Sequence, residues 1–508
     1  MPRMVASGII GFGLDSFLVY ATARNGCRPT MTSLQQHATR IVHTLRERGH
    51  QAYFAGGCVR DLLLGREPAD YDVATEATPR QVMQIFPQTY AVGEQFGVVL
   101  VPFEAETAKA ETTKDTKEHE GGQTQQLSRP SLPPSLPPST RKAVEVATFR
   151  SDIGYSDGRH PDEVRFTKDP REDAERRDFT INGMMLDPAT NEILDFVGGR
   201  ADLAAGVIRA IGDAERRFEE DKLRMLRGVR FAARFDYEIE PATLAAMQKL
   251  AGKIHQVSFE RVREELTKML TEGHARRAFE LLDLSGLLRE VLPEITAMKG
   301  VEQPPQFHPE GDVFIHTLLL LERLQPDISG SISKTLAWGA LLHDVGKPPT
   351  FRVAPDRIRF DGHVDVGVKM AAEILRRLRF SNYETQQILA LVANHMRFAD
   401  VQRMKQSTLK KFLRMPAFDE HLELHRIDCL SSHGHLDLYE YSREQLHSMP
   451  PEEIRPKPLI SGRDLMAAGY QPGPLFKEIL TAVEDAQLEG RLASPEAAIE
   501  YVRREFPS

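Results

Sequence analysis

Residues 54–72 carry the sequence feature that most constrains the fold. They read Phe-Ala-Gly-Gly-Cys-Val-Arg-Asp-Leu-Leu-Leu-Gly-Arg-Glu-Pro-Ala-Asp-Tyr-Asp. A short apolar strand over Ala52–Phe54 leads into Gly56 and Gly57, and a helical segment follows. Glycines at such a turn let backbone amides approach a phosphate, and a helix N-terminus adds N–H donors and a favourable dipole. This order of strand, Gly-Gly, helix and acidic strand predicts a phosphate-binding α/β domain.

Three carboxylates are candidates for the chemistry of this domain. Asp70 and Asp72 lie two residues apart, so we expect both in one strand with their carboxylates on one face. Such a pair suits one or two Mg²⁺ ions that bridge a triphosphate and an attacking hydroxyl. Glu145 lies in the predicted strand Ala143–Phe149 between apolar neighbours, which is unusual for a merely solvated acid. It is a candidate third catalytic carboxylate, and an edge-strand charge is the alternative.

The composition excludes several other classes of protein. The 508 residues are 41% hydrophobic and 27% charged, which is typical of globular proteins with several domains. No apolar run reaches the ~18 residues of a membrane helix, so we expect no membrane partner. Three scattered cysteines argue against structural disulfides and favour the reducing cytoplasm. A net charge of -8 argues against a globally basic nucleic-acid coat.

Two segments fall outside the expected folded parts. Residues 1–30 are an extension of unknown role, either a targeting segment or a non-essential addition. Residues 104–140 are rich in Thr, Lys, Glu and Gln and then in Pro and Ser, so we expect a disordered insertion between the strands Val98–Phe103 and Ala143–Phe149. A proline-rich docking ligand is the alternative for that insertion. Helical periodicity over Ser33–Arg48 predicts a helix, and after about residue 200 we expect helices without strands.

Later motifs complete a resemblance to a known family. Residues 54–72 resemble the signature of the DNA polymerase beta-like nucleotidyltransferases. Three further segments resemble motifs of the bacterial-type (class II) CCA-adding tRNA nucleotidyltransferase and poly(A) polymerase family, which implies a Mg²⁺-dependent enzyme that acts on tRNA with ATP and CTP. These segments are Arg-Arg-Asp-Phe-Thr-Ile-Asn at 176–182, Phe-Glu-Glu-Asp-Lys-Leu-Arg-Met-Leu-Arg at 218–227 and Ser-Phe-Glu-Arg-Val-Arg-Glu-Glu-Leu at 258–266.

One pair of residues suits the selection of a base without a template. Asp221 and Arg224 are three residues apart, so on one helix they would be neighbours on one face. Asp221 can accept from the amine of cytosine or adenine while Arg224 donates to the ring nitrogen, and uracil and guanine reverse both groups. An ordinary salt bridge is the alternative. Together with the motifs of the resemblance, this gives the full set of predicted nucleotide-binding residues: Gly56, Gly57, Arg60, Arg177, Asp178, Asn182, Asp221, Arg224, Arg227 and Arg230.

The helical half contains a second set of polar residues. The segment Leu-Leu-His-Asp-Val-Gly-Lys at 341–347 places a His-Asp pair at the end of an apolar helix. With other histidines and an aspartate at long spacings, it resembles the HD phosphohydrolase domain, which implies a site for a divalent transition metal. The expected ligands are His316, His343, Asp344, His363, His395 and Asp428, whereas His433 and His435 are expected on the surface.

The predicted fold class is α+β, a nucleotidyltransferase head with a mixed sheet followed by an all-α neck, HD domain and tail. The expected ranges are a head at 31–200, a neck at 201–277, an HD domain at 278–455 and an RNA-contacting segment at 456–508. A polar loop at Tyr155–Pro161 and the segment Val92–Gly97 resemble CCA-adding members. We therefore predict CCA addition. A poly(A) or A-adding polymerase, an HD phosphodiesterase or phosphatase with an RNA-binding head, and a simple RNA-binding module are the alternatives.

Overall fold

The computed structural model describes residues 32–93, 97–102, 143–154, 163–306, 308–327 and 329–507. The extension 1–30, the insertion 104–140, the loop Tyr155–Pro161 and part of the segment Val92–Gly97 lie outside these residues. The chain divides into two compact units, Met1–Asp221 and Lys222–Ser508, each described here by itself. Among the described helices, none is both long and apolar enough to cross a lipid bilayer.

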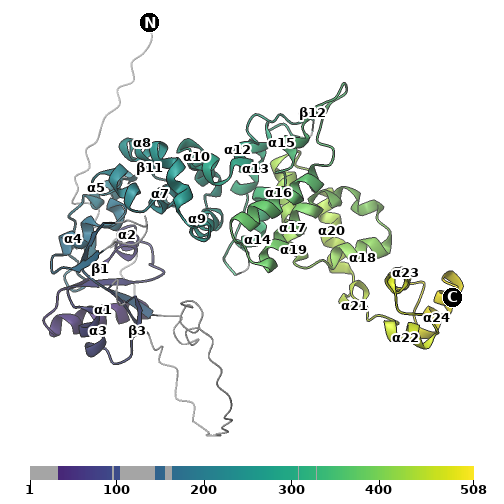
Figure 1. The fold of residues 1–508 in the computed structure, drawn as a ribbon, viewed down its shortest axis with the longest axis horizontal. Helices are drawn as coiled ribbons and strands as arrows, with labels where there is room; N and C mark the ends of the chain where they lie inside the picture. Colours follow the sequence, from purple (N-terminus) through teal and green to yellow (C-terminus); the bar gives the residue numbers. More distant parts are fainter. Residues whose placement is uncertain are drawn as a thin grey trace, which may run out of the picture. The chain divides into compact units, whose positions relative to one another are not determined.

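A seven-stranded mixed sheet organises the first unit (Figure 1). Its central pair, β2 and β5, is parallel, and the other neighbours are antiparallel. Antiparallel pairing of β4 with β5 confirms the predicted hairpin around the insertion. The strands, in spatial order, are β3 (Tyr90–Gly93), β4 (Val98–Pro102), β5 (Ala143–Thr148), β2 (Asp72–Thr75), β1 (Ala52–Ala55), β8 (Met185–Leu186) and β9 (Ile193–Leu194).

The predicted first helix is present and packs on this sheet. Helix α1 buries the apolar positions that its periodicity predicts, and the Thr32 hydroxyl caps it by accepting from the N–H of Gln35. A separate antiparallel pair, β6 (Arg150–Ile153) and β7 (Glu163–Phe166), follows β5. The helices of this unit are α1 (Ser33–Glu47), α2 (Gly57–Leu63), α3 (Pro79–Ile85), α4 (Pro170–Glu175), the 3₁₀ turn η4 (Thr180–Asn182), α5 (Gly199–Ala205) and α6 (Ala214–Glu220).

The second unit is mainly helical. Its last three helices include a small core of their own, built around Leu465, Ile479 and Val502. The helices are α7 (Leu223–Phe235), α8 (Pro241–Leu250), η5 (Ala251–Gln256), α9 (Phe259–Thr271), α10 (Ala275–Leu284), α11 (Leu287–Val291), α12 (Pro293–Thr296), α13 (Val313–Glu322), α14 (Lys334–Leu342), α15 (Lys347–Thr350), α16 (His363–Arg377), α17 (Asn382–Asn394), η6 (His395–Arg403), α18 (Gln406–Leu413), α19 (Phe418–Ser431), α20 (Asp437–Ser448), α21 (Pro451–Ile454), α22 (Gly462–Ala467), α23 (Pro474–Leu488) and α24 (Pro495–Glu505).

The expectation that strands stop near residue 200 is wrong. Short strands occur at β10 (Val207–Ile208), β11 (Glu238–Ile239), β12 (Arg352–Val353) and β13 (Ile358–Arg359). β12 and β13 form an antiparallel hairpin between α15 and α16. Each of these strands has two residues, which is too short for an alternating pattern to show in the sequence.

Candidate functional sites

The three predicted carboxylates meet where β2 and β5 run side by side. Asp72 begins β2, and the parallel register places it directly beside Glu145 of β5. Asp70 precedes the strand, so the prediction that both aspartates lie within one strand is wrong for Asp70. Between the two aspartates, Tyr71 is buried and its ring packs edge-on against Phe54, with 5.2 Å between the ring centroids.

The electrostatics of this cluster are those of crowded acids. Burial, followed by the charges of Glu145 and Asp70, raises the pKa of Asp72 to about 7. Glu145 is open to solvent, yet partial desolvation of its carboxylate and then the charge of Asp70 raise its pKa as well. A divalent cation would relieve this repulsion, so the residues present fit a metal ion bound by oxygen ligands.

Arg177 lies against the turn between β1 and α2. Gly56 has φ 77°, a left-handed conformation, and a Cβ there would lie 2.8 Å from Nη1 of Arg177 and 3.6 Å from Oδ2 of Asp72. Glycine is therefore required both by the backbone and by the close approach of this guanidinium. The turn thus brings a cation to the edge of the carboxylate cluster.

A buried acid that was not predicted holds both neighbouring arginines. Asp173 is 1% exposed and pairs with Arg176 at 2.7 Å and with Arg177 at 3.0 Å. Although burial lowers the pKa of Arg177, Asp173, Asp72 and Asp178 together raise it. The sequence did hold a signal for these contacts. Arg176 and Arg177 follow Asp173 by three and four residues, and residues at such spacings are neighbours on a helix.

A second chain of hydrogen bonds joins α2 to η4. Nη1 of Arg60 donates to Oδ1 of Asn182 at 2.6 Å, and Nδ2 of Asn182 donates to Oδ1 of Asp178 at 3.2 Å. Arg60 and Asn182 are both buried. Three predicted nucleotide-binding residues are thus tied together beside the Gly56 turn.

Asp221 and Arg224 do not share one helix, which corrects the prediction. Helix α6 ends at Glu220, and Asp221 is extended with φ -143° and ψ 107°. A new turn then opens α7, in which the N–H of Met225 donates to the carbonyl of Lys222 at 3.2 Å. The extended residue interrupts the helical ladder, so an i,i+3 argument does not apply to this pair.

The other predicted arginines of α7 lie around Phe231. Arg227 and Arg230 approach its ring at 5.3 Å and 4.4 Å. Arg230 is buried and pairs with Glu265 of α9 at 2.7 Å and with Glu272 at 3.3 Å. The second unit thus fixes this guanidinium by two acids of the adjacent helix and the following turn.

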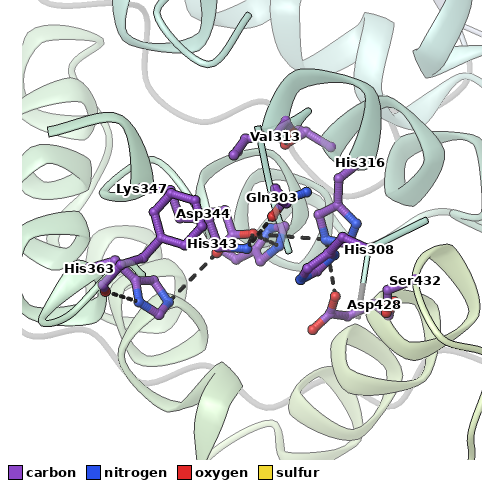
Figure 2. A network of polar contacts seen from close by, with 12 residues as sticks. Gln303, His308, Val313, His316, His343, Asp344, Lys347, His363, Asp428 and Ser432 are labelled. Carbon is purple, nitrogen blue, oxygen red and sulfur yellow. Dashed lines mark hydrogen bonds and ion pairs between the residues drawn. The ribbon is translucent and has the colours of Figure 1, made fainter. Parts of the chain in front are cut away.

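The six predicted HD residues converge in the second unit, and most of them appear in Figure 2. Asp344 lies at the centre. Its Oδ2 is 3.1 Å from Nε2 of His343 and 3.8 Å from that of His316, and its Oδ1 is 3.8 Å and 3.7 Å from those of His363 and His395. Asp428 lies 3.1 Å from Nε2 of His316. The set offers imidazole and carboxylate ligands from helices far apart in the sequence.

The imidazoles are oriented toward this centre by their other nitrogen. Nδ1 of His343, His363 and His395 donates to the carbonyl three residues earlier, at 2.9, 3.0 and 2.8 Å. Nε2 of each is thereby directed toward Asp344. Buried Nε2 of His343 and Oδ1 of Asp344 make no hydrogen bond among the described residues. Such orphaned atoms in a donor set of this kind fit a bound metal ion.

Several residues around the HD centre were not predicted as site residues. Lys347 lies 2.7 Å from Oδ2 of Asp344 and donates to Oε1 of Gln303 at 2.6 Å. His308 and Glu310 contact His316. Lys347 lies three residues after Asp344 in the same short segment, whereas Gln303, His308 and Glu310 precede α13 without a recognisable pattern. His433 and His435 are exposed, as predicted.

Comparisons with known families divide the chain in a similar way. A profile described as "Poly A polymerase head domain" matches residues 52–131 and 137–209. One described as "Probable RNA and SrmB- binding site of polymerase A" matches 236–299, and one described as "HD domain" matches 313–431.

Individual proteins extend this likeness over almost the whole chain. A CCA-adding enzyme of Bacillus pumilus is 39% identical over 257 residues, 51% of this chain and 55% of its own length, so this match spans about half of that relative. One of Lactococcus lactis is 31% identical over 90% of this chain and 94% of its own length. The crystal structure of the Bacillus stearothermophilus CCA-adding enzyme in complex with CTP is similar with a TM-score of 0.66 and 26% identity, covering 93% of this chain and 98% of that one.

Proposed function

Because the chain belongs to the family of CCA-adding enzymes, we propose that it adds C, C and A to the 3′ end of tRNA, using CTP and ATP without a nucleic-acid template. The observation that carries the proposal is the cluster formed by Asp72 and Glu145 on neighbouring strands and Asp70 just before β2, with Arg177 at its edge. Acids that repel one another beside a guanidinium suit a metal-bound triphosphate.

We assign Mg²⁺ to the carboxylate cluster. Asp70 and Asp72, with Glu145, would hold it, and when bound it would neutralise phosphate charge and activate the attacking 3′ hydroxyl. Arg177 follows α4 and lies beside the Gly56 turn, from where it would donate to the triphosphate. Asp173 keeps its guanidinium in place. Arg60, Asn182 and Asp178 hold the α2 and η4 backbones that face the nucleotide.

Selection of the base is assigned to Asp221, the last residue of the first unit, and to Arg224, near the start of the second. Asp221 would accept from the amine of cytosine or adenine, and Arg224 would donate to the adjacent ring nitrogen. Uracil and guanine would leave both groups unpaired, which gives strong discrimination. Arg227 and Arg230 of α7 complete the proposed set: Arg227 would supply further positive charge, whereas Arg230, whose charge Glu265 and Glu272 balance, would hold α7 in place.

The remaining assignments follow the predicted organisation. We assign the head to 31–200, the neck to 201–277, the HD domain to 278–455 and RNA contacts to 456–508. Cysteine usage favours the cytoplasm as the location of the protein.

A poly(A) or A-adding polymerase is the alternative within the same chemistry, because it would use the same carboxylates.

One assay tests the proposal against this alternative. Purified protein receives Mg²⁺ and a tRNA that ends at its discriminator base, with CTP and ATP given singly and together. Three added nucleotides, with A added only after two C, support CCA addition. A long A tail would favour polyadenylation, and no addition in any mixture would overturn the proposal.

A second function is favoured by the histidine cluster around Asp344. We propose that it binds a divalent transition metal and hydrolyses phosphate esters, because buried imidazoles and carboxylates with orphaned atoms suit such an ion. The test supplies Mn²⁺, Co²⁺ or Ni²⁺ with a 2′,3′-cyclic nucleotide or a 2′-phosphate. Hydrolysis by the wild type and its loss in His343→Ala support the activity, and equal rates in both proteins contradict it.

A further inference from the structure

Three of the four histidines at the HD centre are oriented by the backbone, and one is not. His343 and His395 follow the last turns of α14 and α17, and His363 opens α16. The last carbonyls of a helix lack intrahelical partners, so the imidazole Nδ1–H of His343 and His395 can bond those of α14 and α17. His363 instead uses the carbonyl of Phe360, which precedes α16. Each of these histidines bonds the carbonyl three residues earlier.

His316 has no such carbonyl, because it lies inside α13. The carbonyls around it belong to the helix, and that of Val313 also accepts from the Thr317 hydroxyl at 2.9 Å. Nδ1 of His316 instead bonds Oε1 of Glu310 at 2.7 Å. Both groups are well enclosed, with side-chain exposures of 0% for His316 and 7% for Glu310.

The same carboxylate oxygen also receives a second imidazole. Nδ1 of His308 lies 2.9 Å from Oε1 of Glu310, and the rings of His308 and His316 pack edge to face at 4.9 Å between centroids. Figure 2 shows the two rings together, with Asp428 on the Nε2 side of His316. An acceptor on Nδ1 keeps the proton there and leaves the Nε2 lone pair for a metal.

The segment that carries Glu310 is anchored to the HD centre by a further contact. Gln303 is 3% exposed, and its Oε1 accepts from Lys347, whose Nζ lies 2.7 Å from Asp344. At the other end Asp312 caps α13 by accepting from the N–H of Ile315 at 2.7 Å. Glu310 is thus supported on both sides, which restricts its carboxylate.

We propose that Glu310 is a positioning residue of the HD metal site. Its carboxylate, which His308 also contacts, holds His316 in the tautomer and orientation that present Nε2 to the metal. The inference rests on the proposed metal site. It assigns a role to an acid outside the six predicted ligands and makes the segment before α13 part of the centre.

The test measures metal affinity in the full-length protein after removal of metal with EDTA. Co²⁺ alone is the probe, followed by calorimetry and by its visible absorption, which reports the ligand geometry. Glu310→Ala should raise the Kd for Co²⁺ about 10–100-fold and alter the absorption of the saturated site. Glu310→Gln should have a smaller effect, because an amide oxygen still accepts from one Nδ1–H. Glu302→Gln, an exposed change nearby, should behave as the wild type.

Two outcomes would overturn the inference in distinguishable ways. Co²⁺ affinity and absorption of Glu310→Ala equal to the wild type would remove the role of Glu310 and leave the metal site intact. Absence of Co²⁺ binding in the wild type would remove the metal site itself. If melting curves in EDTA show that Glu310→Ala does not fold, Glu310→Gln carries the test, with a several-fold rise in Kd expected and no rise contradicting it.

Discussion

The carboxylate cluster of the first unit and the histidine cluster of the second handle charge in opposite ways. Asp72 lies among other acids, and burial with this repulsion raises its pKa to about 7. Asp344 is also buried, but His343 and Lys347 hold its pKa well below the ordinary value. The first site therefore accumulates unrelieved negative charge, whereas the second already balances its acid with basic groups.

Because of this difference in charge and ligand type, the two sites suit different cations. Oxygen ligands with excess negative charge favour Mg²⁺ in company with a triphosphate. Imidazoles around the carboxylates of Asp344 and Asp428 favour a transition metal held by the protein alone. The two proposed sites would thus keep two metal-dependent chemistries apart by the type of ligand that each offers.

The largest expected effect is loss of nucleotide addition in Asp72→Asn. Removing one carboxylate of the cluster should lower the addition rate at least about a thousandfold, roughly 4 kcal/mol of transition-state stabilisation. Co²⁺ binding at the histidine cluster should stay within twofold of the wild type. Addition at more than a tenth of the normal rate would contradict the assignment of the carboxylates.

Asp173→Asn should have the next largest effect, on stability. Asp173 neutralises two arginines in a buried place, so its removal leaves uncompensated charge and should lower the free energy of unfolding by about 3–5 kcal/mol. Asp169→Asn is the matched control, because Asp169 is an exposed cap of the same helix and Asn caps equally well. Urea denaturation measures both, and a change below ~0.5 kcal/mol in Asp173→Asn would be incompatible with this role.

Metal binding should stabilise the second unit by a smaller amount. Co²⁺ at about a hundredfold above its Kd should add ~2.7 kcal/mol to the free energy of unfolding. The gain should vanish in His343→Ala and persist in His433→Ala, whose histidine is exposed. Thermal melting with and without Co²⁺ provides the measurement, and equal gains in both variants would argue against a metal at the histidine cluster.

The smallest effect concerns pH in metal-free protein. The pKa of Asp72 is about 7 in the folded chain and near the ordinary 3.8 when unfolded, so the folded state binds more protons between these values. Its contribution to stability therefore falls as pH rises from about 4 to 7. In EDTA at pH 8, Asp72→Asn should be more stable than the wild type, and the two proteins should differ less at pH 5. Chemical denaturation at pH 5 and pH 8 checks this, and a difference that does not grow with pH would count against it.

Much of the fold and most of the site could be predicted, because local patterns carry them. The Gly-Gly turn, the strands β1, β2, β4 and β5 and the buried face of α1 follow from short motifs and periodicity. The break between α6 and α7 was not predictable, since a single extended residue, Asp221, interrupts two helical patterns. Asp173 and Glu310 escaped prediction because their importance comes from burial and from contacts to Arg177 and His316, which only the folded chain defines.

Nucleotide addition by His343→Ala tests the separation of the two sites most directly. The variant, the wild type and His433→Ala receive Mg²⁺, CTP, ATP and a tRNA lacking its terminal CCA, and the products are resolved at single-nucleotide length. We expect three added nucleotides for all three proteins, at rates within twofold of one another. A loss of a hundredfold or more in folded His343→Ala would contradict it, because addition would then depend on the histidine cluster.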